Sequence, residues 1–88
     1  MEIKIKLYGS SKILSDKDIL KIKLPNNSNI EKVRDVLTKI IFEKKLKNNL
    51  DNLPKTAAFL SAKDEVINDS YKLTDKEFIS IIPPIGGG

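Results

Sequence analysis

The sequence has 88 residues and a mass of 9.9 kDa, enough for one domain but not for two separate hydrophobic cores. Hydrophobic residues make up 40% and charged residues 32%, a composition typical of a globular domain and not of a disordered or membrane-spanning chain. Cysteine and histidine are absent, which excludes disulfides, zinc–thiolate sites, a thiolate nucleophile and the commonest general base. We therefore expect a protein that is not an enzyme and holds no metal.

The charge balance is 16 basic against 12 acidic residues, a net charge of +4. A basic domain of this size can bind nucleic acid through phosphates. However, the lysines are interleaved with Asp and Glu along the whole chain, and Arg34 is the single arginine, the residue type preferred for base and phosphate recognition. We interpret the lysines as a solvated surface and expect no nucleic-acid partner.

The N-terminus carries no targeting signal, because Met1 is followed by Glu2 and a strand-like alternation rather than by an apolar segment. No apolar run approaches the roughly 20 residues that a membrane helix needs. We expect a soluble, cytoplasmic protein with no membrane association.

The N-terminal third predicts an antiparallel hairpin. From Glu2 to Leu7, and again over residues 19–24, apolar and charged residues alternate with a period of two, which indicates two half-buried strands. The sequence Gly9-Ser10-Ser11 ends the first strand, and we expect Ile13 and Leu14 to fold under the turn that follows.

The apolar period then changes to that of a helix, which we expect from about residue 29 to 46. Ser28 and Glu31 have the spacing of a capping box. An apolar stripe follows at helical spacing, with charged residues expected to point outward. The stripe favours core packing over a groove for a partner; its residues are Ile30, Val33, Leu37, Ile40 and Ile41, and the outward set is Glu31, Lys32, Arg34, Asp35 and Lys39.

The C-terminal half predicts a loop over residues 48–55, with Leu50 and Leu53 folded back on the core, and three more strands. These strands span 57–61, 66–67 and 78–82, and a polar corner at 73–77 precedes the last one. Because the last strand is apolar on both sides, we place it centrally in the sheet. The order of two strands, one helix and then these strands, with the first and last strands parallel, predicts an α+β fold: the β-grasp, or ubiquitin-like roll, with a mixed sheet and one main helix.

The sequence ends in Pro83-Pro84-Ile85-Gly86-Gly87-Gly88, and we expect a domain over residues 1–82 followed by a flexible tail over 83–88. The two prolines lack an N–H and stop the strand. Glycines contribute nothing to a core, but without a Cβ they can thread a narrow channel. The tail can thus deliver a carboxylate on Gly88 to the active site of another protein; the alternative is a tail without a role.

Residues 73–88 resemble the ubiquitin-like sulfur carriers, and more specifically the small subunit of molybdopterin synthase. Members of that family end in Leu-x-(Asp/Glu), a polar turn, a hydrophobic strand and Pro-Pro-(Val/Ile)-x-Gly-Gly, which is similar to Leu73-Thr74-Asp75 and Pro83 to Gly88 here. The first strand, ending in Tyr8-Gly9, also resembles the family. The sequence departs from the pattern at Lys76-Glu77, where the family has Gly-Asp, and at Lys63, in a region where the family often has Asn.

The resemblance implies that an E1-like adenylating enzyme uses ATP and Mg²⁺ to adenylate Gly88, which a persulfide then converts into a thiocarboxylate. The carrier itself binds no cofactor. Pro83, Pro84, Ile85, Gly86 and Gly87 then insert into the large subunit of molybdopterin synthase, in a heterotetramer, and sulfur passes to the molybdopterin precursor of molybdenum cofactor biosynthesis. Tyr8 and Phe78 are candidates for the face that docks on these partners.

Other functions remain open at this point. The Gly-Gly end is shared by sulfur carriers for thiamine synthesis and tRNA thiolation, and by protein modifiers whose terminal glycine is joined to a substrate lysine. A third class is a small basic module that binds RNA through its lysines. Deleting Gly87 and Gly88 distinguishes this last class, because only RNA binding survives the deletion.

Overall fold

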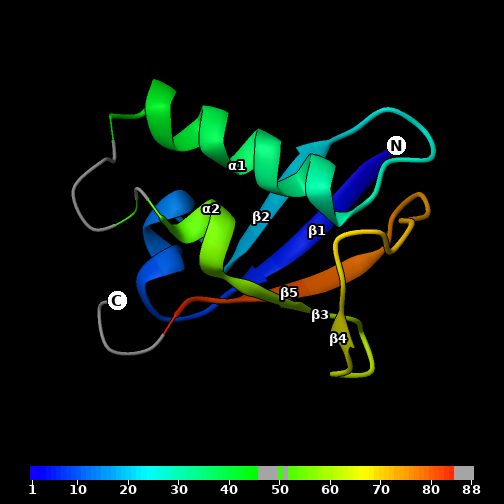
Figure 1. Cartoon of the computed structure of the whole chain (residues 1–88). Helices are drawn as coiled ribbons and strands as arrows, with labels where there is room; N and C mark the ends of the chain where they lie inside the picture. Colours follow the sequence, from blue (N-terminus) through cyan, green and yellow to red (C-terminus); the bar gives the residue numbers. More distant parts are fainter. Residues whose placement is uncertain (46–49, 51, 85–88) are drawn as a thin grey trace.

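The computed structural model describes residues 1–45, 50 and 52–84, and its ribbon is shown in Figure 1. The predictions made for Ile85, Gly86, Gly87 and Gly88 lie outside the described residues. In chain order the elements are β1 (Glu2–Leu7), the 3-10 helix η1 (Gly9–Leu14), β2 (Ile19–Lys23), α1 (Ile30–Glu43), α2 (Leu53–Thr56), β3 (Ala58–Leu60), β4 (Val66–Ile67) and β5 (Phe78–Ile82).

The strands form one mixed sheet in the order β2-β1-β5-β3-β4. The predicted hairpin is present, because β1 and β2 are antiparallel with Ile3 opposite Ile22. The first and last strands lie side by side and parallel, with Ile5 beside Ile79, and β5 is central, as predicted. Since α1 crosses one face of this sheet, the fold is the predicted β-grasp.

The core lies between α1 and one face of the sheet (Figure 1). Strands β1 and β5 contribute their alternate residues to it, and all of these side chains are at most 1% exposed: Ile3, Ile5, Leu7, Ile79 and Ile81. Leu37 of α1 is completely buried, and Leu50 and Leu53 fold back on the core as predicted. Leu14 is also completely buried, whereas Ile13 is 59% exposed, so the prediction for Ile13 was wrong.

The start of α1 differs from the predicted capping box. Asn29 is the N-cap, and its side-chain oxygen accepts a hydrogen bond of 3.1 Å from the backbone N–H of Lys32. The Ser28 hydroxyl donates instead to the carbonyl of Pro25 at 2.7 Å, so it closes the preceding turn. Both residue types are favourable N-caps, and the competing turn bond decides between them. The helix ends at Glu43, earlier than predicted, and Lys45 beyond it has a left-handed φ of 55°.

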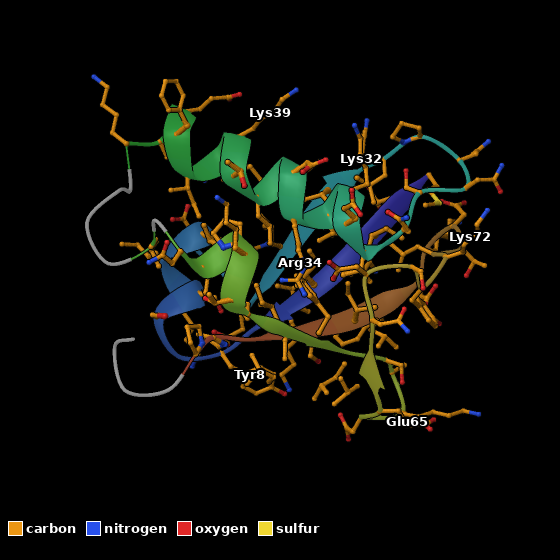
Figure 2. The ribbon with its side chains drawn as sticks, in the orientation of Figure 1. Tyr8, Lys32, Arg34, Lys39, Glu65 and Lys72 are labelled. Carbon is orange, nitrogen blue, oxygen red and sulfur yellow. The ribbon has the colours of Figure 1, made fainter. Side chains whose placement is uncertain are left out.

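Arg34 points inward, contrary to the prediction of an outward side chain (Figure 2). Its guanidinium pairs with Asp69 at 2.9 Å and donates to the backbone carbonyls of Pro54 and Ala57. It also lies over the ring of Phe59, 5.0 Å from the centroid. Arg34 thus joins α1 to α2, β3 and the segment after β4, and its donors are engaged within the fold rather than presented to a phosphate.

The polar corner before β5 is held by hydrogen bonds to Glu77. One carboxylate oxygen accepts from the Thr74 N–H at 2.9 Å, and the other accepts from the Tyr71 hydroxyl at 2.6 Å, which together with burial raises the pKa of Tyr71. Lys76 adopts a left-handed φ of 65°, a conformation that glycine favours. Lys76, where the sequence departs from the Gly of the family pattern, thus has a backbone conformation that a glycine adopts more readily.

Candidate functional site

The candidate site is the C-terminal end of β5, from which the predicted tail leaves the domain. β5 pairs with β1 as far as Ile81 and with β3 as far as Ile82. Pro83 is half-buried and Pro84 is exposed, and neither residue can donate a further ladder bond. Pro83 and Pro84 therefore stand where a central strand ends and the chain turns to solvent.

The turn after β1 lies beside this exit (Figure 1). Gly9 has a φ of +54°, a conformation that favours glycine. Ser11, completely buried, closes the turn: its hydroxyl donates to the Tyr8 carbonyl at 2.6 Å and accepts from the Tyr8 N–H at 3.0 Å. A Cβ on Gly9 would lie 3.5 Å from Cγ of Pro83, in ordinary van der Waals contact. The turn thus lies close to Pro83, with room between them for no more than a small side chain on Gly9.

The left-handed conformation of Gly9 makes a prediction for stability. Gly9→Ala should lower the free energy of unfolding by about 1–2 kcal/mol, because an L-residue is strained in this region. Gly9→Asn should recover most of the loss, since Asn tolerates the left-handed region. Urea denaturation of the three proteins measures both effects. Equal losses in the two variants would contradict this account and assign the cost to the contact with Pro83.

The structure places Tyr8 and Phe78 on the same face of the sheet, opposite α1, but does not bring them together. Tyr8 is 38% exposed and follows Leu7, which pairs with Ile81, so Tyr8 lies near Ile82 at the exit (Figure 2). Phe78 is half-buried and pairs with Lys4, at the far end of β5. Four residues of strand separate the two ends, about 13 Å. Tyr8 is therefore beside the exit, and Phe78 is remote from it.

The other residues of this face were not predicted from the sequence. The face turned away from α1, which we call the open face, carries an apolar half on β5, β3 and β4, with Val66 77% exposed; it comprises Phe78, Ile82, Ala58, Leu60 and Val66, around the buried Ser80. Phe78, Ser80 and Ile82 are alternate residues of β5 and so point to the same face of the sheet. This spacing could have indicated an apolar surface, but the prediction used only the fact that the strand is apolar on both sides.

Among residues 1–45, 50 and 52–84, no three or more Asp and Glu side chains gather where they could hold a metal ion. No helix in the same part of the chain is long and apolar enough to cross a membrane. What the arrangement can do is hold the start of a C-terminal segment in a fixed direction beside an exposed face.

Comparison with known proteins identifies the fold. No protein-family model matches the sequence, and no curated protein matches it either. Solved structures do match. SAMP1 from Haloferax volcanii is similar with a TM-score of 0.69 at 13% identity, over 100% of both chains. A putative molybdopterin converting factor, subunit 1, from Pyrococcus furiosus matches with a TM-score of 0.70 at 14% identity, over 96% of this chain and 98% of that one.

A third match is the protein–protein complex of subunits 1 and 2 of molybdopterin-converting factor from Helicobacter pylori, with a TM-score of 0.59 at 22% identity over 100% of both chains. The chain therefore has the β-grasp fold of ubiquitin-like proteins. Within that class, the structures it matches include small archaeal modifiers and the first subunit of molybdopterin converting factors, as the sequence resemblance implied.

Proposed function

We propose that this protein is a sulfur carrier whose C-terminal glycine, Gly88, is adenylated and then converted into a thiocarboxylate. The observation that carries the proposal is the position of the chain exit. The central strand β5 runs directly into Pro83 and Pro84 and from there into Gly86-Gly87-Gly88. Pro83 lies near the turn at Gly9, and the exposed Pro84 follows it, so the described part of the chain ends at the surface.

In the proposed reaction, this chain supplies the acyl group and its partner supplies the chemistry. The Gly88 carboxylate attacks the α-phosphorus of ATP on an E1-like enzyme, with Mg²⁺ bound there, and pyrophosphate leaves. A persulfide sulfur attacks the carbonyl carbon of this acyl adenylate, and AMP leaves with the bonding electrons. A second thiol then reduces the sulfur–sulfur bond, which frees the thiocarboxylate. Gly86 and Gly87 lack side chains and fit a narrow channel to the adenylation site.

The destination that we propose is the molybdopterin precursor, with the large subunit of molybdopterin synthase as the second partner. Two observations support it: the similarity of residues 73–88 to the small subunit of that enzyme, and the structural match to molybdopterin converting factor proteins, one of them in a complex of subunits 1 and 2.

A second candidate is a protein modifier joined through Gly88 to a lysine of another protein. The matches to SAMP1 and to a small archaeal modifier protein 1 from Haloferax volcanii favour it. The adenylation step is the same in both functions, and only the nucleophile that attacks the activated glycine differs.

Pyrophosphate exchange tests the shared step. We expect the cognate E1-like enzyme to exchange labelled pyrophosphate into ATP only when this protein is present, and the protein alone to hydrolyse no ATP. A variant ending at Gly86 should give no exchange, because its carboxylate falls about 7 Å short of the adenylation site. Full exchange with the shortened variant, or ATP hydrolysis by the purified chain alone, would contradict the proposal.

A further inference from the structure

The open face is divided into two halves of different chemistry. The apolar half was described above. The other half, on β1 and β2, carries four lysines on alternate positions, which we call the basic half: Lys4, Lys6, Lys21 and Lys23. The two halves meet along β1 and β5, where Lys4 pairs with Phe78 and Lys6 pairs with Ser80. The Lys6 ammonium also lies over the Tyr8 ring, 5.3 Å from its centroid.

The lysines of the basic half are placed against one another by the strand register. Lys4 lies directly opposite Lys21, a like-charge pair that destabilises a sheet. Glu2, opposite Lys23, is the one carboxylate within this set of strand positions. None of the four ammonium groups forms an ion pair with a residue that the structure describes. The fold thus maintains a concentration of positive charge that it does not neutralise.

The need to protect the edge of the sheet from pairing with other chains explains only part of the basic half. β2 is an edge strand, and lysines on such a strand prevent pairing with other chains. β1, however, is paired on both sides, so Lys4 and Lys6 protect no edge. They instead border the apolar half, in which Val66 is 77% exposed. An apolar patch rimmed on one side by charge is typical of a protein-binding surface.

Nucleic acid fits this face poorly. Single-stranded nucleic acid is bound by stacking on aromatic rings and by arginine. The apolar half is mostly aliphatic, Tyr8 and Phe78 stand at opposite ends of β5, and the guanidinium of Arg34 is engaged on the other side of the sheet. The observations therefore favour a protein partner.

We infer that the partner that docks on the open face carries an acidic patch, which binds the basic half while an apolar area of the same partner covers the apolar half. The inference rests on the proposed function: the exit of the carboxyl end at Pro83 borders this face, and we assign the face to the E1-like enzyme, the first of the two proposed partners to receive the carboxyl end. The carboxylates of that enzyme would neutralise Lys4 and Lys21. Attraction between unlike patches speeds encounter and fixes the register of docking.

Two double variants with the same net charge test the inference. Lys4→Glu/Lys21→Glu reverses two of the four charges of the basic half. It replaces one like-charge pair across the strands by another, so the repulsion between these two positions is kept. The control, Lys32→Glu/Lys39→Glu, reverses two exposed lysines on the side of α1 away from the sheet (Figure 2). The readout is the KM for carrier in pyrophosphate exchange with the cognate E1-like enzyme, at about 0.05 M and about 0.5 M ionic strength.

We expect the Lys4/Lys21 variant to raise KM by about tenfold or more at low ionic strength, because it sets carboxylates against carboxylates. Its maximal rate should be unchanged, since the reacting glycine is intact, and the difference should shrink at high salt. The KM of the control variant should stay within about twofold of the wild-type KM. Equal KM values for the two variants, whether both unchanged or both raised, would overturn the inference.

Binding of a fluorescent single-stranded RNA oligonucleotide is measured with the same proteins. Loss of RNA binding in the Lys4/Lys21 variant with an unchanged KM would assign the basic half to nucleic acid and overturn the inference. If the wild-type protein itself supports no exchange, the proposed function fails. If the wild type is active and only the comparison of variants fails, the acidic partner surface is wrong and the carrier function stands.

Discussion

One extra alanine after Gly88 should abolish sulfur loading of this protein while leaving its fold intact. The added residue moves the terminal carboxylate about 3.5 Å beyond the adenylation site, and errors of even 1 Å in the position of a reacting group cost about a hundredfold in rate. Gly87→Val should have a similar effect, because a branched side chain stands where the wall of a channel approaches the backbone. Both changes lie beyond Pro84, which is exposed, and beyond the last pair of the ladder.

Intact mass after incubation with the E1-like enzyme, ATP and a persulfide donor measures the loading, and thermal denaturation measures the fold. The control is Glu65→Val, which places the same side chain at an exposed position in the β3–β4 turn, away from the exit (Figure 2). We expect the control to load normally, and all three variants to keep a free energy of unfolding within about 0.5 kcal/mol of the wild type. Wild-type loading of the extended protein would remove the C-terminal glycine from the mechanism.

Leu37→Ala should destabilise the protein by about 2–5 kcal/mol, the range observed when a large buried side chain is truncated. Leu37 is completely buried in the core between α1 and the sheet. Thr38→Ala, one residue further on the exposed face, is the control. Its hydroxyl donates only to the Arg34 carbonyl in the preceding turn, and alanine has the higher helix propensity, so the change should be within about 0.5 kcal/mol.

Urea denaturation of the two variants measures both changes. A loss below about 1 kcal/mol for Leu37→Ala would show that α1 does not pack on the sheet through this residue. A large loss of free energy of unfolding for Thr38→Ala would show that α1 is buried through the face that carries Thr38 and not through the face that carries Leu37.

The fold was predictable because its main elements have strong periodic patterns. The alternation in β1 and β2 predicted which of their side chains point to the core. The apolar run from Phe78 to Ile82 predicted a central strand, and β5 is central in the sheet. The short elements were not predicted. η1 and α2 are six and four residues long, too short for a helical period to be visible. Arg34 was placed on the outside because its partners, Asp69 and two carbonyls, come from distant segments that no local pattern connects.

The candidate site was predictable only in part. Its position at the end of the last strand followed from Pro83 and Pro84, because prolines cannot donate ladder hydrogen bonds and therefore end a central strand. The closeness of the turn at Gly9 to the end of β5 is a tertiary arrangement of residues far apart in the sequence. The basic half of the open face depends on the register that sets Lys4 opposite Lys21, and the sequence alone shows these lysines as scattered.

The central claim is that Gly88 carries the activated sulfur, and an intact-mass measurement tests it most directly. The wild-type protein is incubated with the cognate E1-like enzyme, ATP, Mg²⁺, a persulfide donor and a reducing thiol, and its intact mass and fragment masses are then measured. We predict a gain of about 16 Da, from the exchange of one oxygen for sulfur, confined to the fragment that ends in Gly88. A mass that stays at that of the unmodified chain, or a gain located on any other residue, would contradict the claim.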